Sequence, residues 1–509
     1  MAEKEKRVTS AKFADGSILE MVYVPKEGKA YLVQAKTNEV GEVEFKTDKG
    51  FEIEENQITV KYLPLNSEDA LINGGFIKFP SKVENFESNQ ELFREICDHI
   101  KKYFQFPEDF LQIAASYVLL TWIYDSFTAL PYLRYISSYG SGKSRGLEVI
   151  GSLCYKATFV GGAASPASIF RTVDQIRGTF IIDESDYKSS DMYDTIVKIL
   201  NAGHAKGSPV LRMEPQGKDK GMVTRCFNVF GPKILASRTR YKDEALESRC
   251  ITGRLLPLSG SQVKVPIHVG EEFEMESEHL RNKLLLFRFR NIKSDKVSDE
   301  TLKDLELPRV KQSFLALVSA ADLVSKELVK EIIEYAKAYE KDLQLITAES
   351  SIEADVLVCL LELIKEFSSS KEKELGIGVK LVAQRYDDKY SFDVLERTDS
   401  SVWYPTNYHV SPKRIGGIIG GMGIRKRQGR GGFFIPPEEF EKVFVLAKRY
   451  GVADMLYKNG SGSDLVNGPG ETEDDSESEK KINTETKETE SGSGGGRGGS
   501  DNYPKFLGL

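Results

Sequence analysis

A glycine-rich octet between a strand-like run and a helical run constrains the fold of this chain more than any other feature. Residues 137–144 read SSYGSGKS, preceded by YLRYI and followed by RGLEVIGSLCY. Glycines let the backbone N–H groups of such a turn close around an anion, and the helix N-terminus adds its positive end. From about residue 131 to 258, short apolar runs alternate with helical stretches. This pattern predicts an α/β core in which helices flank a parallel sheet.

The octet predicts a phosphate-binding P-loop. In such a loop Lys143 pairs with the β and γ oxygens of ATP, and the Ser144 hydroxyl reaches Mg²⁺. The full pattern begins with glycine, and Ser137 stands in that place here. The alternative is a surface turn that happens to contain GKS. The residues expected to contact ATP are Ser138, Tyr139, Gly140, Ser141, Gly142, Lys143, Ser144 and Arg145.

Two carboxylates close an apolar run about forty residues after Lys143. The run reads GTFIIDESD, from Gly178 to Asp186. Carboxylates at the tip of a buried strand are costly unless a cation or water meets them. We therefore expect Asp183 to hold Mg²⁺ through water, and Glu184 to orient and deprotonate the attacking water. The alternative is a strand that ends in a solvated acidic turn.

A polar strand end follows further along the chain. Ser237 closes the strand-like run KILAS and is a candidate sensor of the γ-phosphate, on the strand between the loop and the acids. Thr239 and Asn228 are weaker choices for the same role. Any strand can end in serine, so the alternative is a strand end without a role in catalysis.

Arg249 is the candidate arginine of the site. It lies in KDEALESRCI, at the end of a helical stretch. An arginine held there can reach the γ-phosphate of a neighbouring subunit and spread the charge of the transition state. The alternative is an internal salt bridge to Glu247 or Asp243.

Taken together, SSYGSGKS, IIDES, the polar strand end and ALESRCI resemble the AAA+ ATPases. They look most like the helicase-type ATPases of plasmid, phage and integrated-element replication modules. The resemblance covers roughly residues 131–258, and the helical lid is matched less specifically. It implies a homo-oligomeric ring, frequently a hexamer, in which the arginine acts in trans.

The flanking segments predict further domains. Residues 1–65 alternate apolar and polar positions, which indicates a small antiparallel sheet or barrel. Residues 66–130 form a helical lead-in, and 259–350 a helical lid with its extension. A compact unit is expected at 351–457. Residues 458–509 are rich in Gly, Ser and Glu, which predicts a disordered tail that could offer a replication protein its last residues.

Two basic regions are candidate DNA contacts. A hairpin at about 210–230 carries Lys218 and Lys220 in its turn, with a solvated turn as the alternative. Residues 411–435 read SPKRIGGIIGGMGIRKRQGRGGFFI, which resembles a winged helix. Its alternative is a protein-docking winged helix with a solvated basic edge. The expected DNA-binding residues of this unit are Lys413, Arg414, Arg425, Lys426, Arg427 and Arg430.

Composition limits the possible classes of protein. No apolar run approaches the roughly 20 residues of a membrane helix, so we expect a cytoplasmic protein without membrane contact. The leading hypothesis is an ATP- and Mg²⁺-dependent DNA helicase or translocase that acts in replication, for example of a mobile element. The alternative is an initiator or switch in which ATP controls assembly on DNA without unwinding. A P-loop kinase is disfavoured because no site for a second substrate is evident.

Overall fold

The computed structural model describes most of the chain between residues 4 and 453. The described residues are 4–38, 42–55, 58–136, 142–160, 164–183, 190–215, 221–241, 243–255, 265–350, 352–369, 375–390, 393–397, 403–407 and 410–453. They belong to the first of two compact units, Met1–Leu456, and the second is Tyr457–Leu509. The tail expected at 458–509 therefore lies outside the described residues. None of the described helices is both long and apolar enough to cross a membrane.

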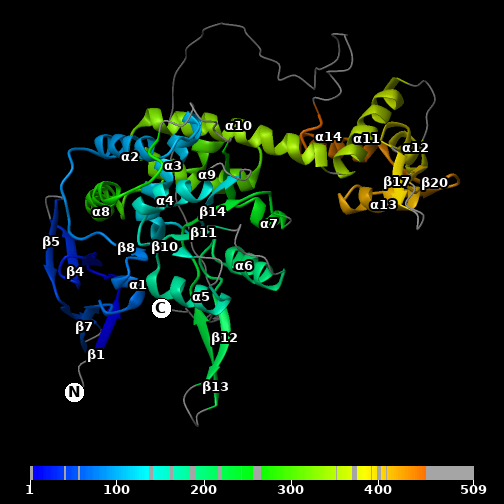
Figure 1. Ribbon diagram of the computed structural model, residues 1–509. Helices are drawn as coiled ribbons and strands as arrows, with labels where there is room; N and C mark the ends of the chain where they lie inside the picture. The colour runs from blue at the N-terminus through cyan, green and yellow to red at the C-terminus, as the bar shows by residue number, and fades with distance from the viewer. Residues whose placement is uncertain are drawn as a thin grey trace, which may run out of the picture. The chain divides into compact units, whose positions relative to one another are not determined.

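A mixed α/β core carries the expected nucleotide site (Figure 1). Within the described residues its sheet has six strands, in the order β15-β9-β14-β11-β10-β8. The pairs from β15 to β10 are parallel, and β8 is antiparallel to β10. The strands are β8 (Ile77–Lys78), β9 (Tyr132–Ile136), β10 (Ala157–Val160), β11 (Phe180–Asp183), β14 (Lys233–Ser237) and β15 (Cys250–Arg254). The parallel sheet is confirmed, and β8 joins it from a segment expected to be helical.

The strands are apolar almost throughout because both faces of the sheet are covered. On β9, Leu133 and Tyr135 pack into one hydrophobic cluster, whereas Tyr132 packs into another. The first cluster includes α4, and the second includes α5 and α6. The helices of this region are α4 (Lys143–Leu153), α5 (Pro166–Ile176), α6 (Ser190–Ala202) and α7 (Glu244–Glu247).

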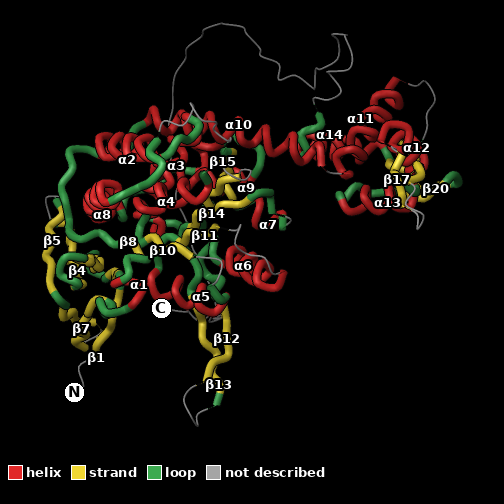
Figure 2. The backbone as a smooth tube through the Cα atoms, in the orientation of Figure 1, coloured by secondary structure: helices red, strands yellow, loops and turns green. Residues whose placement is uncertain are grey.

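The helices before and after the α/β core share its larger hydrophobic cluster (Figure 2). α8 contacts α2, α3 and α4, and α9 contacts α3. The segment expected to be a lid therefore packs with the lead-in helices as one layer, since α8 and α9 both bury apolar faces there. These helices are α2 (Asn89–Tyr103), α3 (Glu108–Trp122), η1 (Tyr124–Ser126), α8 (Glu271–Asn291), η4 (Asp299–Leu302), α9 (Pro308–Asp322) and α10 (Lys326–Ser350).

The N-terminal region contains two small sheets. A four-stranded antiparallel sheet has the order β2-β3-β4-β5, and a three-stranded sheet has the order β1-β7-β6. The β1–β7 pair is parallel, which differs from the expected all-antiparallel arrangement. The elements are β1 (Lys4–Val8), β2 (Ser10–Lys12), β3 (Ile18–Val24), β4 (Lys29–Thr37), β5 (Val43–Asp48), β6 (Phe51–Glu55), β7 (Ile58–Pro64) and α1 (Ala70–Asn73).

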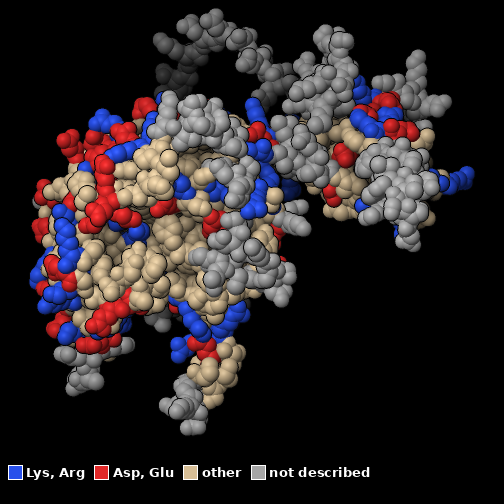
Figure 3. Space-filling model, viewed as in Figure 1, with Lys and Arg blue, Asp and Glu red and all other residues tan. Residues whose placement is uncertain are grey.

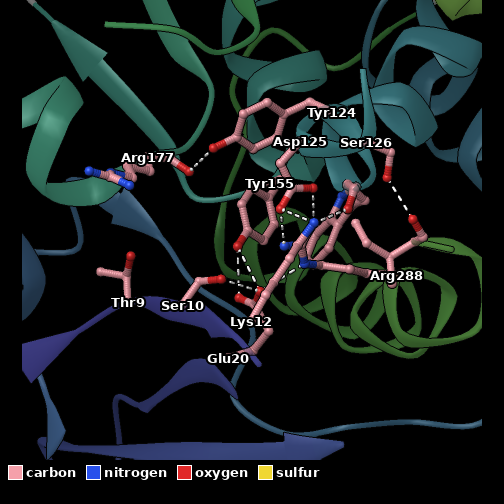
Figure 4. Close-up of polar contacts among 12 residues, drawn as sticks. Thr9, Ser10, Lys12, Glu20, Tyr124, Asp125, Ser126, Tyr155, Arg177 and Arg288 are labelled. Atoms are coloured by element: carbon pink, nitrogen blue, oxygen red, sulfur yellow. Dashed lines mark hydrogen bonds and ion pairs between the residues drawn. The ribbon is translucent and has the colours of Figure 1, made fainter. Parts of the chain in front are cut away.

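A buried carboxylate on β3 joins this region to the core (Figure 4). Glu20 is fully buried and accepts hydrogen bonds from Arg288 Nε at 2.8 Å and from the Tyr155 hydroxyl. Lys156 Nζ lies 3.0 Å from its other oxygen. Burial opposes the charge of Glu20, but Arg288 and Lys156 hold its pKa below the ordinary value. Because an unpaired charge here would be costly, the N-terminal sheets are fixed to the core.

A hairpin and a C-terminal module complete the described chain. The hairpin expected at 210–230 is present as β12 (Val210–Pro215) and β13 (Met222–Phe227). The C-terminal module has a hydrophobic cluster of its own. Its elements are α11 (Ile352–Ser369), β16 (Ile377–Gly378), α12 (Val379–Tyr390), β17 (Asp393–Arg397), β18 (Trp403–Asn407), α13 (Pro412–Gly421), β19 (Arg427–Gly429), β20 (Gly432–Ile435), η5 (Pro437–Glu439) and α14 (Phe440–Arg449).

Candidate nucleotide and nucleic-acid sites

The carboxyl ends of three neighbouring strands bring the expected nucleotide-site residues together. Ile136, the last residue of β9, pairs with Ser237 of β14. Asp183, the last residue of β11, pairs with Ala236 of the same strand. β14 therefore lies between the strand before the octet and the strand before the acids, as expected for the sensor strand. Ligands of parallel α/β sheets bind at this carboxyl edge.

The start of α4 shows why the octet needs glycine near its end. Gly142 precedes the helix with φ +79°, in the left-handed region that favours glycine. A Cβ at Gly142 would lie 3.2 Å from the Phe104 ring, and one at Gly146 would lie 3.3 Å from it, so the ring packs directly against both glycines. Residues 137–141 lie outside the described residues, so the expected contacts of Ser138, Tyr139, Gly140 and Ser141 remain predictions.

The two expected magnesium ligands are in direct contact. The Ser144 hydroxyl donates a hydrogen bond to Asp183 Oδ2 at 3.0 Å. Ser144 lies at the start of α4, and Asp183 is the last residue of β11. Both therefore lie at the carboxyl edge of the sheet, where their side chains can meet. A hydroxyl and a carboxylate form the oxygen donor set that Mg²⁺ prefers. Glu184, the expected base, lies outside the described residues.

Arg238 is a residue of the site that sequence reasoning missed. It follows β14 directly and is exposed beyond the ends of β9 and β11. Burial lowers the pKa of Lys143, the positive charge of Arg238 lowers it further, and Asp183 opposes the shift. Within the described part of the chain, no ion pair includes Arg238. The sequence signal that could have identified Arg238 is its position directly after Ser237, the polar end of the strand.

The three sensor candidates have different surroundings. Ser237 is buried, and its hydroxyl donates to the carbonyl oxygen of Thr239 at 2.9 Å. Thr239 is exposed at the carboxyl edge. Asn228 lies before the start of β14, at the opposite edge, where its side chain accepts a hydrogen bond from the Phe230 backbone. The structure therefore does not bring Asn228 to the nucleotide site.

Arg249 lies between α7 and β15, as expected for an arginine at a helix end. It donates a hydrogen bond to Asn201 Oδ1, and its buried Nε has no hydrogen-bond partner in the described structure. No described ion pair joins it to Glu247 or Asp243, so neither internal salt bridge weighed as the alternative forms. Burial and the neighbouring charge of Arg309 lower the pKa of Arg249.

Glu247 is instead bound by the strand that leads into the octet. Its two oxygens accept hydrogen bonds from Arg134 Nη1 and Nη2, both at 2.6 Å. Arg240 Nη1 also donates to it at 2.9 Å. Arg134 is fully buried on β9. This pair connects the strand before the octet to the segment that carries Arg249.

A cavity of about 690 Å³ adjoins the expected phosphate site. Its lining includes Ser144, Arg145 and Asp183. The Arg145 guanidinium donates to the carbonyl oxygens of Pro266 and Ile267, at 3.1 and 2.7 Å. These bonds direct its side chain toward the protein in this structure. The volume is in the range of small-ligand pockets.

The basic residues of the C-terminal module divide into two groups. Ser411 caps α13 by accepting a hydrogen bond from the Arg414 backbone N–H, and Ile415 and Ile419 are buried. Among the expected DNA contacts, the exposed residues are Lys413, Arg414, Arg425, Arg427 and Arg430. Lys426 instead donates to the Gly416 carbonyl oxygen, and Arg427 lies 2.5 Å from Glu438.

The turn of hairpin β12–β13 lies outside the described residues, and with it Lys218 and Lys220. Figure 3 shows Lys and Arg side chains gathered around the root of the hairpin. The strands themselves expose apolar side chains, with Leu211, Met213 and Met222 each more than half exposed. Exposed apolar side chains on a basic hairpin are typical of a contact surface.

Comparison with known proteins gives only distant likenesses. No protein-family model matches the sequence, and no curated protein matches it. Among solved structures, "SCCmec type IV Cch - active helicase" is 11% identical, with a TM-score of 0.35, over 82% of this chain and 81% of that one. The NrS-1 C-terminal region is 13% identical, with a TM-score of 0.32, over 82% and 95%. The Aeropyrum pernix ORC1 protein in complex with DNA is 13% identical, with a TM-score of 0.20, over 71% and 98%. At TM-scores below 0.5, these likenesses do not establish a fold or a function for this chain.

Proposed function

We propose that this protein is an ATP-hydrolysing motor that acts on DNA. The observation that carries the proposal is the contact between Ser144 and Asp183 at the carboxyl edge of the sheet. It joins α4, the helix after the glycine-rich octet, to β11, the strand that ends in acids. In the sheet, β14 lies between β11 and β9, the strand before the octet. This contact supports the proposal because a P-loop ATPase binds its phosphates and metal at that edge.

The residues fit a nucleotide with its magnesium ion. When bound, ATP supplies the phosphoanhydride bond, and Mg²⁺ neutralises charge on its phosphate oxygens. Lys143 binds the β and γ oxygens, Ser144 and Asp183 hold the metal side, and Glu184 holds the proton of the attacking water. Arg238 adds a second positive charge at the γ-phosphate end, and Thr239 is the exposed hydroxyl beside it.

Arg249 serves a neighbouring subunit in this proposal. Within the described residues Arg249 forms no ion pair with Glu247 or Asp243, although the charge of Asp243 raises its pKa. The short helix before it is held by Arg134. An arginine supplied in trans stabilises the transition state. The protein therefore works as a homo-oligomeric ring, with six subunits as the working assumption.

The C-terminal module supports contact with DNA. Its chain order is helix α11, strand β16, helix α12, hairpin β17–β18, helix α13 and hairpin β19–β20, and β20 pairs with β16. Apart from hairpin β17–β18, this order supports a winged helix in which α13 is the recognition helix. Its exposed cations include Lys413, Arg414, Arg425, Arg427 and Arg430, and they contact phosphates without reading sequence.

The test is DNA-stimulated ATP hydrolysis coupled to strand displacement. Wild-type protein should hydrolyse ATP faster with DNA and separate a forked duplex. Lys143→Ala should lose nucleotide binding, and Glu184→Gln should bind ATP but hydrolyse it at least about 100-fold more slowly. Absence of ATPase activity in the wild type would overturn the proposal. Stimulation without strand displacement would favour the initiator or switch instead.

A further inference from the structure

A second cavity lies at the edge of the sheet opposite the nucleotide site. It has a volume of about 600 Å³ and is lined by β2, by the short helix η1 that follows α3, and by the root of hairpin β12–β13. Figure 4 shows several of its residues around Asp125 and Tyr155. Apart from Asn228, the weaker sensor candidate that lies at this opposite edge, none of the residues expected to bind nucleotide belongs to its lining. The N-terminal β region thus contributes one wall of a site that the core alone does not form.

Positive charge exceeds negative charge in this cavity. The lining contains Lys12, Lys206 and Arg177 against one carboxylate, Asp125. The Asp125 carboxylate is already bound by Arg288, at 2.9 and 3.0 Å, and by Lys12 at 2.8 Å. Arg177 is paired with Asp174 at 3.4 Å, so the cations that an added anion would meet are Lys12 and Lys206.

Lys206 is the cation with the least compensation. Its ammonium donates to the backbone carbonyl oxygen of Asp125 at 2.9 Å, and no ion pair within the described residues includes it. Burial lowers the pKa of Lys206; Asp125 raises it, and the charge of Lys12 lowers it again. An anion bound between Lys12 and Lys206 would relieve this repulsion.

The cavity continues into the basic root of the hairpin. Ser208 and Pro209, in the lining, lead directly into β12, and Asn228 follows β13. Along the hairpin, Glu214 accepts from Arg171 at 2.5 Å and lies 3.3 Å from Arg225. This one carboxylate therefore meets two arginines, and the positive charge of Arg212 is in excess. Lys and Arg side chains are visible around this root in Figure 3. An extended polyanion fits such a row of cations better than an isolated ion does.

The aromatic rings of the cavity are not available for base stacking. Tyr124 and Phe230 are 5% and 6% exposed, and Tyr155 is 2% exposed. A free nucleotide would find no exposed ring for its base, whereas a phosphate backbone needs only the cations and polar groups. The volume admits a nucleotide-sized part of a strand and excludes a duplex.

We propose that this cavity binds the phosphate backbone of single-stranded nucleic acid, with Lys12 and Lys206 as its contacts. The N-terminal β region then has a defined role, because β2 supplies Lys12. The proposal rests on the proposed DNA motor, and it places part of the DNA path between the hairpin root and the N-terminal sheet.

Salt-dependent binding of a fluorescent oligothymidylate tests the proposal. Each phosphate contact contributes about 0.7 to the slope of log affinity against log salt for single strands. Lys206→Ala should bind about 3- to 10-fold more weakly at low salt and lower the slope by about 0.7. Lys12→Ala should do the same, and Lys12→Arg, which keeps the pair with Asp125, should retain both values. Lys330→Ala, which removes an exposed lysine of α10 outside the cavity, is the matched control.

Two further arms identify the ligand. An oligonucleotide with an uncharged methylphosphonate backbone should abolish the difference between wild type and Lys206→Ala. Inorganic phosphate or ATP that displaced the oligonucleotide at equal concentration would show a free-phosphate site and overturn the proposal. Equal affinity and slope in wild type and Lys206→Ala would overturn it as well, while leaving the motor intact. Wild-type protein that bound no DNA would instead overturn the motor and this site together.

Discussion

Arg134 and Glu247 form a buried, bidentate ion pair between the strand that leads into the glycine-rich octet and the short helix before Arg249. Both hydrogen bonds measure 2.6 Å, and the Arg134 side chain is fully buried. Arg134 also donates to the Thr252 hydroxyl of β15. One arginine therefore ties together β9, β15 and α7, the elements that position the phosphate loop and the arginine proposed to act in trans.

Glu247→Gln should destabilise the protein by about 3 kcal/mol, because it leaves the buried Arg134 charge without a carboxylate. Urea unfolding followed by circular dichroism measures the change. Arg240→Gln removes a partly exposed donor to the same carboxylate and should lower stability by less than about 1 kcal/mol. Equal losses in the two variants would show that the pair with Arg134 is not the stabilising one.

Asp183→Asn should raise the Mg²⁺ concentration needed for half-maximal ATPase activity by about 10- to 100-fold, because the variant removes the carboxylate that contacts Ser144. A magnesium titration at saturating ATP measures the effect. Glu148→Gln is the control, since Glu148 lines the same cavity but pairs with Arg145 at 3.3 Å. An unchanged magnesium requirement in Asp183→Asn would remove Asp183 from the metal site.

Arg238→Ala should weaken ATP binding by about 10-fold, as expected for one hydrogen bond to a charged group. ADP binding should change less than about 2-fold, because Arg238 meets only the γ-phosphate end. Calorimetry with ADP and a slowly hydrolysed ATP analogue measures both affinities. Arg254→Ala is the control, because Arg254 ends β15 on the other side of β9, where it pairs with Ile136. Equal losses for ATP and ADP would contradict a role at the γ-phosphate.

Arg249→Ala and Lys143→Ala subunits should each be inactive alone and partly active when mixed. In the mixture, an Arg249→Ala subunit keeps Lys143 and supplies the nucleotide site. Its neighbour, a Lys143→Ala subunit, supplies Arg249. ATPase activity against mixing ratio measures the rescue, and the maximum should lie near equal amounts. A mixture as inactive as either variant alone would place Arg249 in cis.

His99 should make stability fall in mild acid. Burial lowers the pKa of His99 to about 4 despite the nearby Glu276, while Lys102 and Arg281 lower it further. The unfolded chain then binds the extra proton between about pH 6.5 and 4, so stability is lost as the pH falls through that window. From pH 7 to 5 the wild type should lose about 2 kcal/mol more than His99→Gln. Urea unfolding at the two pH values measures this difference, and equal losses would exclude His99 as the cause.

Local patterns in the sequence were enough to predict several elements. The octet, the acids and the strand-like runs predicted β9, α4, β11 and the parallel sheet, because apolar periodicity and glycine-rich turns act over short stretches of chain. The same local signals predicted hairpin β12–β13. The roles of Glu184, Lys218 and Lys220 remain predictions, since these residues lie outside the described ones.

Tertiary structure decided how these pieces meet. Strand pairing joins segments distant in sequence, so the entry of β8 into the sheet and the parallel β1–β7 pair had no local signal. Register brought Asp183 to Ser144 and set Arg238 beside Lys143, and it left Asn228 at the opposite edge. The pairing of Glu247 with Arg134, and not with Arg249, depended on a strand more than a hundred residues away. The sequence by itself determined which chemical groups are present, whereas packing determined which of them act together.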